Sequence, residues 1–245
     1  MTTISRERES KLLGRILWVL CSINILVCML SFSLQMIAPE DGEKDLESKL
    51  MFRLHRFFGV NVESSFATWY NGSLWFCVAV VSVVIAFLGR DDRVLRRGGM
   101  FLALVAAAAS LDEIAQVHES MAILGQWVMG STQESMPIYA HFLWVVPGLV
   151  LSTLIGLSLL KFIRRLPAKA ARGIIAGGVI FLAGALGMEI LSGLWSFRYG
   201  ENAYYQLWVT LEECMEMTGI SVALVSLLSV VRFQPQQKGV NMVLQ

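Results

Sequence analysis

Six long apolar runs, separated by shorter polar segments, dominate the sequence and restrict what the chain can fold into. Each run is close to the roughly 20 residues that a helix needs to cross about 30 Å of hydrocarbon. Only 16% of the residues are charged, against about 25% in a typical soluble domain. The sequence therefore predicts one all-α, polytopic membrane domain over residues 1–245. We expect its spans near residues 14–37, 72–89, 98–125, 139–161, 173–197 and 205–231.

Basic residues in the segments that flank these runs predict the orientation of the chain. They precede the first run, separate the second from the third and the fourth from the fifth, and follow the sixth. Because Lys and Arg accumulate on the cytoplasmic side of membrane proteins, we expect both termini in the cytoplasm. The basic residues form no single patch, so the lipid bilayer is an expected partner and nucleic acid is not.

The longest polar segment, residues 38–71, lies on the outer side in this orientation. It opens with APEDGEKDLESK, which is too charged to enter lipid. Leu46, Leu50, Leu54 and Phe57 then recur at helical spacing. This spacing predicts a short amphipathic helix that lies on the outer membrane surface.

Small residues in the third and fifth runs predict close packing of those two helices. The third run contains AAAAS and the fifth contains AGALGMEI, in which Ala183 and Gly187 form a small-x-x-x-small pair. Small side chains let two helices approach closely within a membrane. We therefore expect the third and fifth helices at the centre of the bundle.

Acidic residues interrupt three of the apolar runs at a similar depth. The stretch SLDEIAQVHES lies in the third run, GMEI in the fifth and TLEECMEMTG in the sixth. At about 1.5 Å of rise per residue, these stretches fall in the middle or the outer half of their spans. The residues of the predicted site are Asp112, Glu113, His118, Glu119, Glu189, Glu212, Glu213 and Glu216, with Gln116 and His141 at its rim.

The charge balance of this site points to protons or a cation. Its seven acids have one histidine among them, and no Lys or Arg lies in the same parts of the three runs. An ionised carboxylate at membrane depth costs several kcal/mol unless it is paired, and neighbouring carboxylates repel one another. Carboxylates with one imidazole form a donor set that suits a divalent metal ion such as Zn, Mn or Fe. The Glu-x-x-His motif of two-metal helical bundles is absent, which favours a single ion.

The motifs SLDEIAQVHE, GALGMEI and EECMEMTG resemble those of a group of bacterial multi-pass membrane proteins with LDE-x4-HE and EE-x2-EM-x-G motifs. The resemblance covers roughly the second to the sixth run. It implies a cell inner-membrane location, a shared architecture and a shared polar site, and no particular reaction. The six-span layout also invites comparison with metal-dependent hydrolases of the ceramidase type. Those enzymes use several histidines, whereas this chain has one in the acidic layer, so that assignment is disfavoured.

Three functions stay open on the sequence alone. In the first, the acids and His118 bind a divalent ion, and an enzyme of this kind would use the ion to activate water or oxygen on a lipid-like substrate. In the second, the acids relay protons or coordinate a transported cation in a transporter or channel. In the third, the chain is a membrane sensor or an assembly subunit, and the acids are protonated, hydrogen-bonded and structural.

Overall fold

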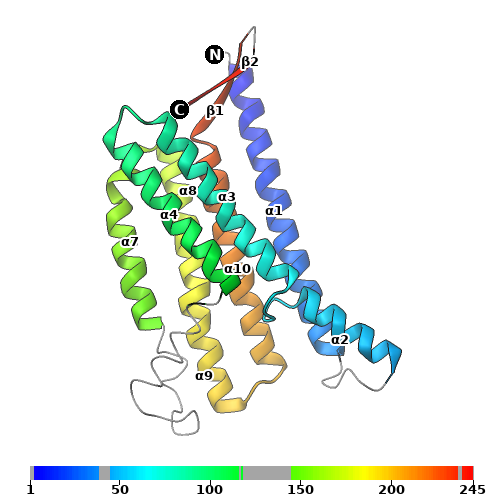
Figure 1. The fold of residues 1–245 in the computed structure, drawn as a ribbon. Helices are drawn as coiled ribbons and strands as arrows, with labels where there is room; N and C mark the ends of the chain where they lie inside the picture. The colour runs from blue at the N-terminus through cyan, green and yellow to red at the C-terminus, as the bar shows by residue number, and fades with distance from the viewer. Residues whose placement is uncertain (1–2, 39–44, 116, 118–144, 237–238, 245) are drawn as a thin grey trace.

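Helices make up almost all of the computed structural model of the chain, which describes residues 3–38, 45–115, 117, 145–236 and 239–244 (Figure 1). A two-stranded antiparallel hairpin follows the last helix. The elements are α1 (Thr3–Ile37), α2 (Leu46–Phe58), α3 (Phe66–Leu88), α4 (Arg93–Ala115), α7 (Val145–Arg165), α8 (Ala168–Leu182), the π-helical η2 (Ala183–Met188), α9 (Glu189–Tyr199), α10 (Ala203–Leu228), β1 (Val231–Gln236) and β2 (Gly239–Leu244).

Five stretches of helix are long and apolar enough to cross a membrane. They correspond to the first five predicted runs, so the prediction of a helical membrane protein is confirmed. The sixth predicted run forms α10, which is 26 residues long and carries three glutamates in its middle. The five stretches are Glu7–Ile37, Phe66–Leu88, Arg93–Ala115, Pro147–Arg165 and Ala168–Tyr199.

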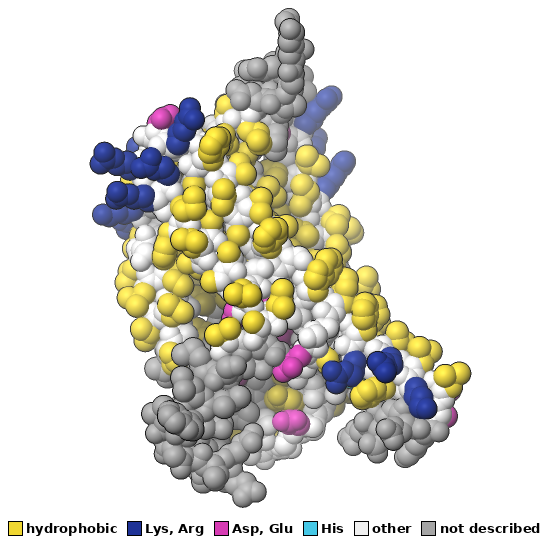
Figure 2. Space-filling view, in the orientation of Figure 1, with side chains coloured by type: hydrophobic (Ala, Val, Ile, Leu, Met, Phe, Trp, Pro, Cys, Tyr) yellow, Lys and Arg dark blue, Asp and Glu magenta, His cyan; other side chains and the backbone are white. Residues whose placement is uncertain are grey.

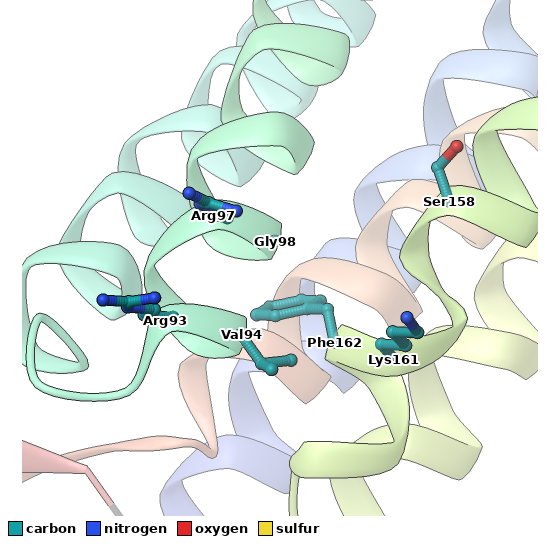
Figure 3. Close-up of a pocket in the computed structure, with 7 residues that line it drawn as sticks. All are labelled: Arg93, Val94, Arg97, Gly98, Ser158, Lys161 and Phe162. Atoms are coloured by element: carbon teal, nitrogen blue, oxygen red, sulfur yellow. The ribbon is translucent and has the colours of Figure 1, made fainter.

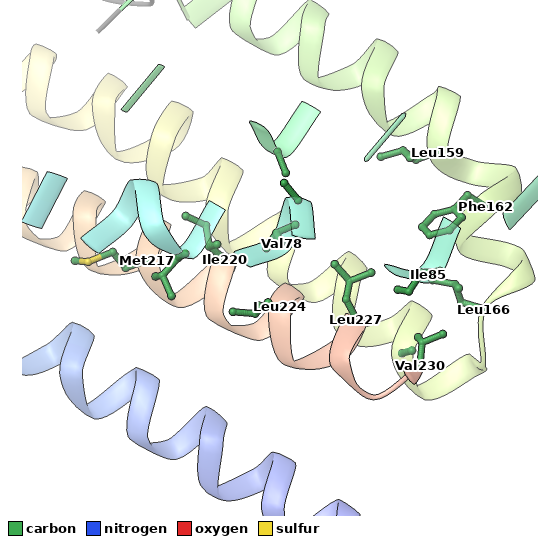
Figure 4. Packing of buried hydrophobic residues seen from close by; sticks show 14 of the residues in the cluster. Val78, Ile85, Leu159, Phe162, Leu166, Met217, Ile220, Leu224, Leu227 and Val230 are labelled. Carbon is green, nitrogen blue, oxygen red and sulfur yellow. The ribbon is translucent and has the colours of Figure 1, made fainter. Parts of the chain in front are cut away.

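The central helix of the bundle is α10, which contacts α1, α3, α8, η2 and α9 (Figure 1). Its side chains Met217, Ile220 and Leu227 are at most 1% exposed and belong to one apolar core with residues of α3 and α7 (Figure 4). In contrast, α4 packs mainly on α3, with α7 beside it. The expectation that the third and fifth helices form the centre is therefore wrong.

Close approach of helices depends on Gly177 of α8 and Gly219 of α10. A Cβ atom on Gly177 would lie 2.5 Å from the backbone oxygen of Gly219, and one on Gly219 would lie 2.5 Å from the backbone nitrogen of Phe181. The predicted pair has no such role, since Ala183 is exposed and a Cβ on Gly187 would meet nothing within 4 Å. The reason is η2, because a π-helical turn adds a residue and shifts the helical faces that the spacing assumed.

A helix, α2, forms where the spacing of Leu46, Leu50, Leu54 and Phe57 predicted one, and its place on a membrane surface stays a prediction. Asp45 caps it by accepting a hydrogen bond from the backbone N–H of Ser48 at 2.7 Å, and this bond lowers the pKa of the Asp45 carboxyl. No residue of α2 is buried, and Leu46, Leu50 and Phe57 are more than half exposed. Such an apolar face is typical of a helix that lies on a membrane surface.

Asp92 joins two helices at the end of the bundle that holds the chain termini. One carboxylate oxygen accepts a hydrogen bond from the backbone N–H of Val94 at 2.8 Å, which caps α4, and the other accepts one from Nε of Arg165 at 2.7 Å. The Arg165 guanidinium is the main reason that the pKa of Asp92 is lowered. This contact therefore stabilises the fold above the ordinary pKa of an aspartate and is lost as the pH falls through the lowered value.

The charges separate along the length of the molecule. Figure 2 shows Lys and Arg gathered at the end that holds the termini and again along α2, with an apolar belt between these two regions. The hairpin at the basic end was not predicted from the sequence. Leu244 of β2 lies against the turn after α3, where a Cβ on Gly89 would be 3.3 Å from its side chain.

Candidate functional site

The end of α4 brings predicted acids against α3. The hydroxyl of Ser110 donates a hydrogen bond to the backbone oxygen of Gly72 at 2.8 Å. One turn further along α4, the Cβ of Glu113 would lie 3.7 Å from a Cβ on Gly72. Glu113 is therefore held against α3 and is partly buried, as is its neighbour Asp112.

The π-helical segment η2 places Glu189 beside α10. A Cβ on Gly184 would lie 2.9 Å from the backbone oxygen of Glu212 and 3.2 Å from Cγ of Glu216, so η2 contacts the acidic turn of α10 directly. Glu189 is the first residue after η2, and its carboxyl group is hydrogen-bonded to that of Glu212. Single π-helical turns within α-helices are frequent at functional sites.

Glu216 lies at the centre of the acids. Glu212, which is 8% exposed, is one turn before it on the same face of α10. The carboxyl groups that act electrostatically on Glu216 come from three helical segments of the chain. We call the set the carboxylate cluster, and its members are Glu113, Glu189, Glu212, Glu213 and Glu216.

The structure thus brings together acids from the third, fifth and sixth predicted runs. Four other predicted residues, Gln116, His118, Glu119 and His141, lie outside the described residues. Within the part of the chain that the structure describes, no three His, Cys, Asp or Glu side chains have the placement of a metal site. The described cluster is a group of interacting carboxyls, and the metal site stays a prediction.

Sequence reasoning missed Asn71 of α3. Its side chain is 1% exposed, and neither its amide oxygen nor its amide nitrogen has a hydrogen-bond partner among the described residues. A buried polar group without a partner costs about 1–3 kcal/mol, so an unpaired amide requires an explanation. The signal in the sequence is an asparagine at the start of an apolar run.

Asn71 directly precedes Gly72, the residue of α3 that lies against Glu113 of the carboxylate cluster. Helix α3 also packs on α10, and Val78 and Ile220 belong to one apolar core (Figure 4). The amide oxygen of Asn71 is therefore a candidate ligand beside the cluster.

A second buried asparagine of the bundle, Asn24, contrasts with Asn71. The hydroxyl of Tyr70 donates to Oδ1 of Asn24 at 2.8 Å, and Nδ2 of Asn24 donates to the hydroxyl of Ser221 at 3.2 Å. Asn24 is fully buried and has partners for both ends of its amide. The fold therefore satisfies one buried asparagine while it leaves its neighbour in the bundle unpaired.

The comparison with protein families gives a single assignment. A family model described as a domain of unknown function (DUF8692) matches residues 20–231, which include every described member of the site. The chain belongs to this family. Comparisons with curated proteins and with solved structures gave no match.

Proposed function

We propose that the chain is a six-span protein of a bacterial inner membrane, with both termini in the cytoplasm, whose carboxylate cluster binds a divalent metal ion. His118 would supply one nitrogen ligand, and Zn, Mn or Fe would suit such a donor set. The cluster lies in the outer half of its helices in this orientation, so the site would open toward the periplasm. Five membrane-compatible stretches and the basic end of the bundle support this arrangement.

The observation that carries the proposal is the set of charges around Glu216. Four other carboxyl groups act on it, and no Lys or Arg occurs between residues 98 and 160, 173 and 197, or 199 and 231. Several carboxylates in a medium of low dielectric constant can ionise together only if a positive charge lies among them. A divalent ion supplies that charge and also a partner for the unpaired oxygen of Asn71.

An enzyme built on this site would act on a lipid-like substrate that enters laterally from the bilayer. The chemistry that a bound divalent ion supplies is the activation of water or oxygen. A glutamate of the cluster that does not bind the ion would serve as the base. Asn71 would orient the substrate or the water that binds next to the ion.

The alternative is proton- or cation-coupled transport, which one observation favours. The side chains of Tyr70, Asn24 and Ser221 are joined by hydrogen bonds. This chain of polar groups continues beyond the cluster toward the basic end. Against it, Met217, Ile220 and Leu224 form an apolar layer on the same helix. In a third interpretation, the chain is a sensor or assembly subunit in which the acids are structural.

Titration calorimetry with Mn²⁺ and Zn²⁺ on the detergent-purified protein tests metal binding. We expect Glu216→Gln to weaken binding by more than about ten-fold, because it removes a charged ligand at the centre of the cluster. Asn71→Leu should weaken binding less. Glu201→Gln removes the same charge from the exposed turn before α10 and should leave the affinity unchanged. Equal affinities in wild-type protein and Glu216→Gln would contradict the proposal.

A further inference from the structure

A groove lies between α4 and α7 at the basic end of the bundle. It is at the opposite end of α4 from Glu113 of the carboxylate cluster. Its volume is about 280 Å³, and a second hollow adjoins it through Val94 and Lys161. Figure 3 shows Val94 of α4 and Phe162 of α7 pointing toward each other across the gap. Arg93 and Arg97 line the α4 side, and Lys161 lines the α7 side.

Gly98 and Phe162 form the floor of this groove. Phe162 is 1% exposed, and a Cβ atom on Gly98 would overlap its side chain. The absence of a side chain at Gly98 thus lets the phenyl ring lie beneath the basic residues. The floor is apolar, while Arg and Lys residues line the rest of the groove.

The positive charge of the groove is not neutralised by the chain around it. Arg165 pairs with Asp92 at 2.7 Å. Among the described residues, Arg93, Arg97, Lys161 and Arg164 have no acidic partner. Several cationic residues that line one hollow without acidic counter-charges favour an anion such as a phosphate group.

The surface next to the groove, toward the middle of the bundle, is apolar. On the side of α4 and α7 that continues toward the middle of the bundle, Leu104, Leu157 and Leu154 are exposed, with exposed fractions of 65%, 59% and 56%. Both helices are among those that can cross a membrane. A ligand in this position would therefore hold its anionic part in the groove and its apolar part along these leucines.

We propose that the groove binds the phosphate headgroup of an anionic phospholipid, with its acyl chains along α4 and α7. Basic pockets between transmembrane helices are known to hold such headgroups. Lys and Arg residues that set membrane orientation also gather at this end. Orientation requires only their number on one side of the membrane, whereas Arg93, Arg97 and Lys161 line a single groove. The proposal does not depend on the metal site.

Native mass spectrometry of the full-length protein in detergent tests the proposal. The probes are dioctanoyl phosphatidylglycerol, dioctanoyl phosphatidylcholine as the neutral lipid, and inorganic phosphate as a competitor. A basic residue close to an anionic headgroup contributes about 1 kcal/mol, and Arg93 and Arg97 both line the groove. Arg93→Gln with Arg97→Gln should therefore weaken phosphatidylglycerol binding about 30-fold. Arg90→Gln with Arg96→Gln removes the same charge from the same region outside the groove and should have little effect.

Four results would overturn the proposal. Equal losses in the two double variants would show an effect of net charge alone. Equal retention of the neutral and anionic lipids would exclude headgroup recognition, and displacement by inorganic phosphate at the lipid's own concentration would identify a free anion as the ligand. The double variant Arg93→Lys with Arg97→Lys keeps the charge and should retain most of the binding. It distinguishes loss of the lipid site from a failure to fold. Loss of binding in that folded lysine variant would also contradict a site based on charge.

Discussion

Gly177→Ala should lower the thermal midpoint of the detergent-purified protein by several degrees, whereas Gly178→Ala should leave it unchanged or raise it. A Cβ atom at residue 177 would lie 2.5 Å from the backbone oxygen of Gly219 and 2.8 Å from the backbone nitrogen of Ala223. Backbone atoms cannot rotate away, so α8 and α10 must separate, at a typical cost of about 1–3 kcal/mol. At residue 178 the added atom would meet nothing within 4 Å, and alanine favours the helix.

The comparison of these two adjacent variants isolates helix packing from helix propensity. Circular dichroism followed against temperature gives both midpoints under one set of conditions. The contact between Gly184 and α10 continues the same interface toward the carboxylate cluster. Separation of α8 from α10 should therefore also weaken metal binding in Gly177→Ala. Equal midpoints in the two variants would contradict the central position of α10 against α8.

Glu216→Gln should raise the thermal midpoint of the metal-free protein and reduce the further increase that metal ion produces. Without an ion, the substitution removes one of five interacting carboxyls and keeps the shape of the side chain, so repulsion decreases. With an ion at 100 times its dissociation constant, binding to the folded state stabilises the wild-type protein by about 2.7 kcal/mol. The variant loses most of this gain because the ion binds more weakly. Thermal unfolding with chelator and with Mn²⁺ measures both effects.

The direction of the two effects separates the three functions. Proton coupling predicts that Glu216→Gln stabilises the protein and that metal ion changes neither midpoint. A structural carboxyl predicts that the substitution lowers both midpoints equally, because it disrupts hydrogen bonds of the folded state. Glu201→Gln, which lies on the exposed turn before α10, controls for net charge and should change neither midpoint.

The membrane-compatible helices and α2 were predictable because their signals are local. A run of apolar residues of sufficient length can avoid exposing backbone polar groups to lipid only as a helix, and the spacing of Leu46, Leu50 and Phe57 specifies one face of a helix. The acidic layer was predictable for a similar reason. The constant rise of a helix converts positions in the sequence into depths, and the structure does bring Glu113, Glu189 and Glu216 together.

The arrangement of the helices was not predictable from the same patterns. In a membrane protein, the side chains that face lipid and those that face the core are equally apolar, so hydrophobic periodicity does not indicate which helix is central. The spacing of Ala183 and Gly187 was misleading because η2 changes the helical repeat at that position. Asn71 was missed because its significance lies in the unpaired amide, which only the packing of α3 shows.

Elemental analysis of the protein as purified tests the central claim, that the carboxylate cluster holds a divalent ion. Inductively coupled plasma mass spectrometry of the detergent-solubilised wild-type protein should find about one Zn, Mn or Fe ion per chain. His118→Ala and Glu216→Ala should each lose it, while Glu201→Ala should retain it. Well-folded wild-type protein that contains no metal, even after incubation with Mn, Fe and Zn, would contradict the account.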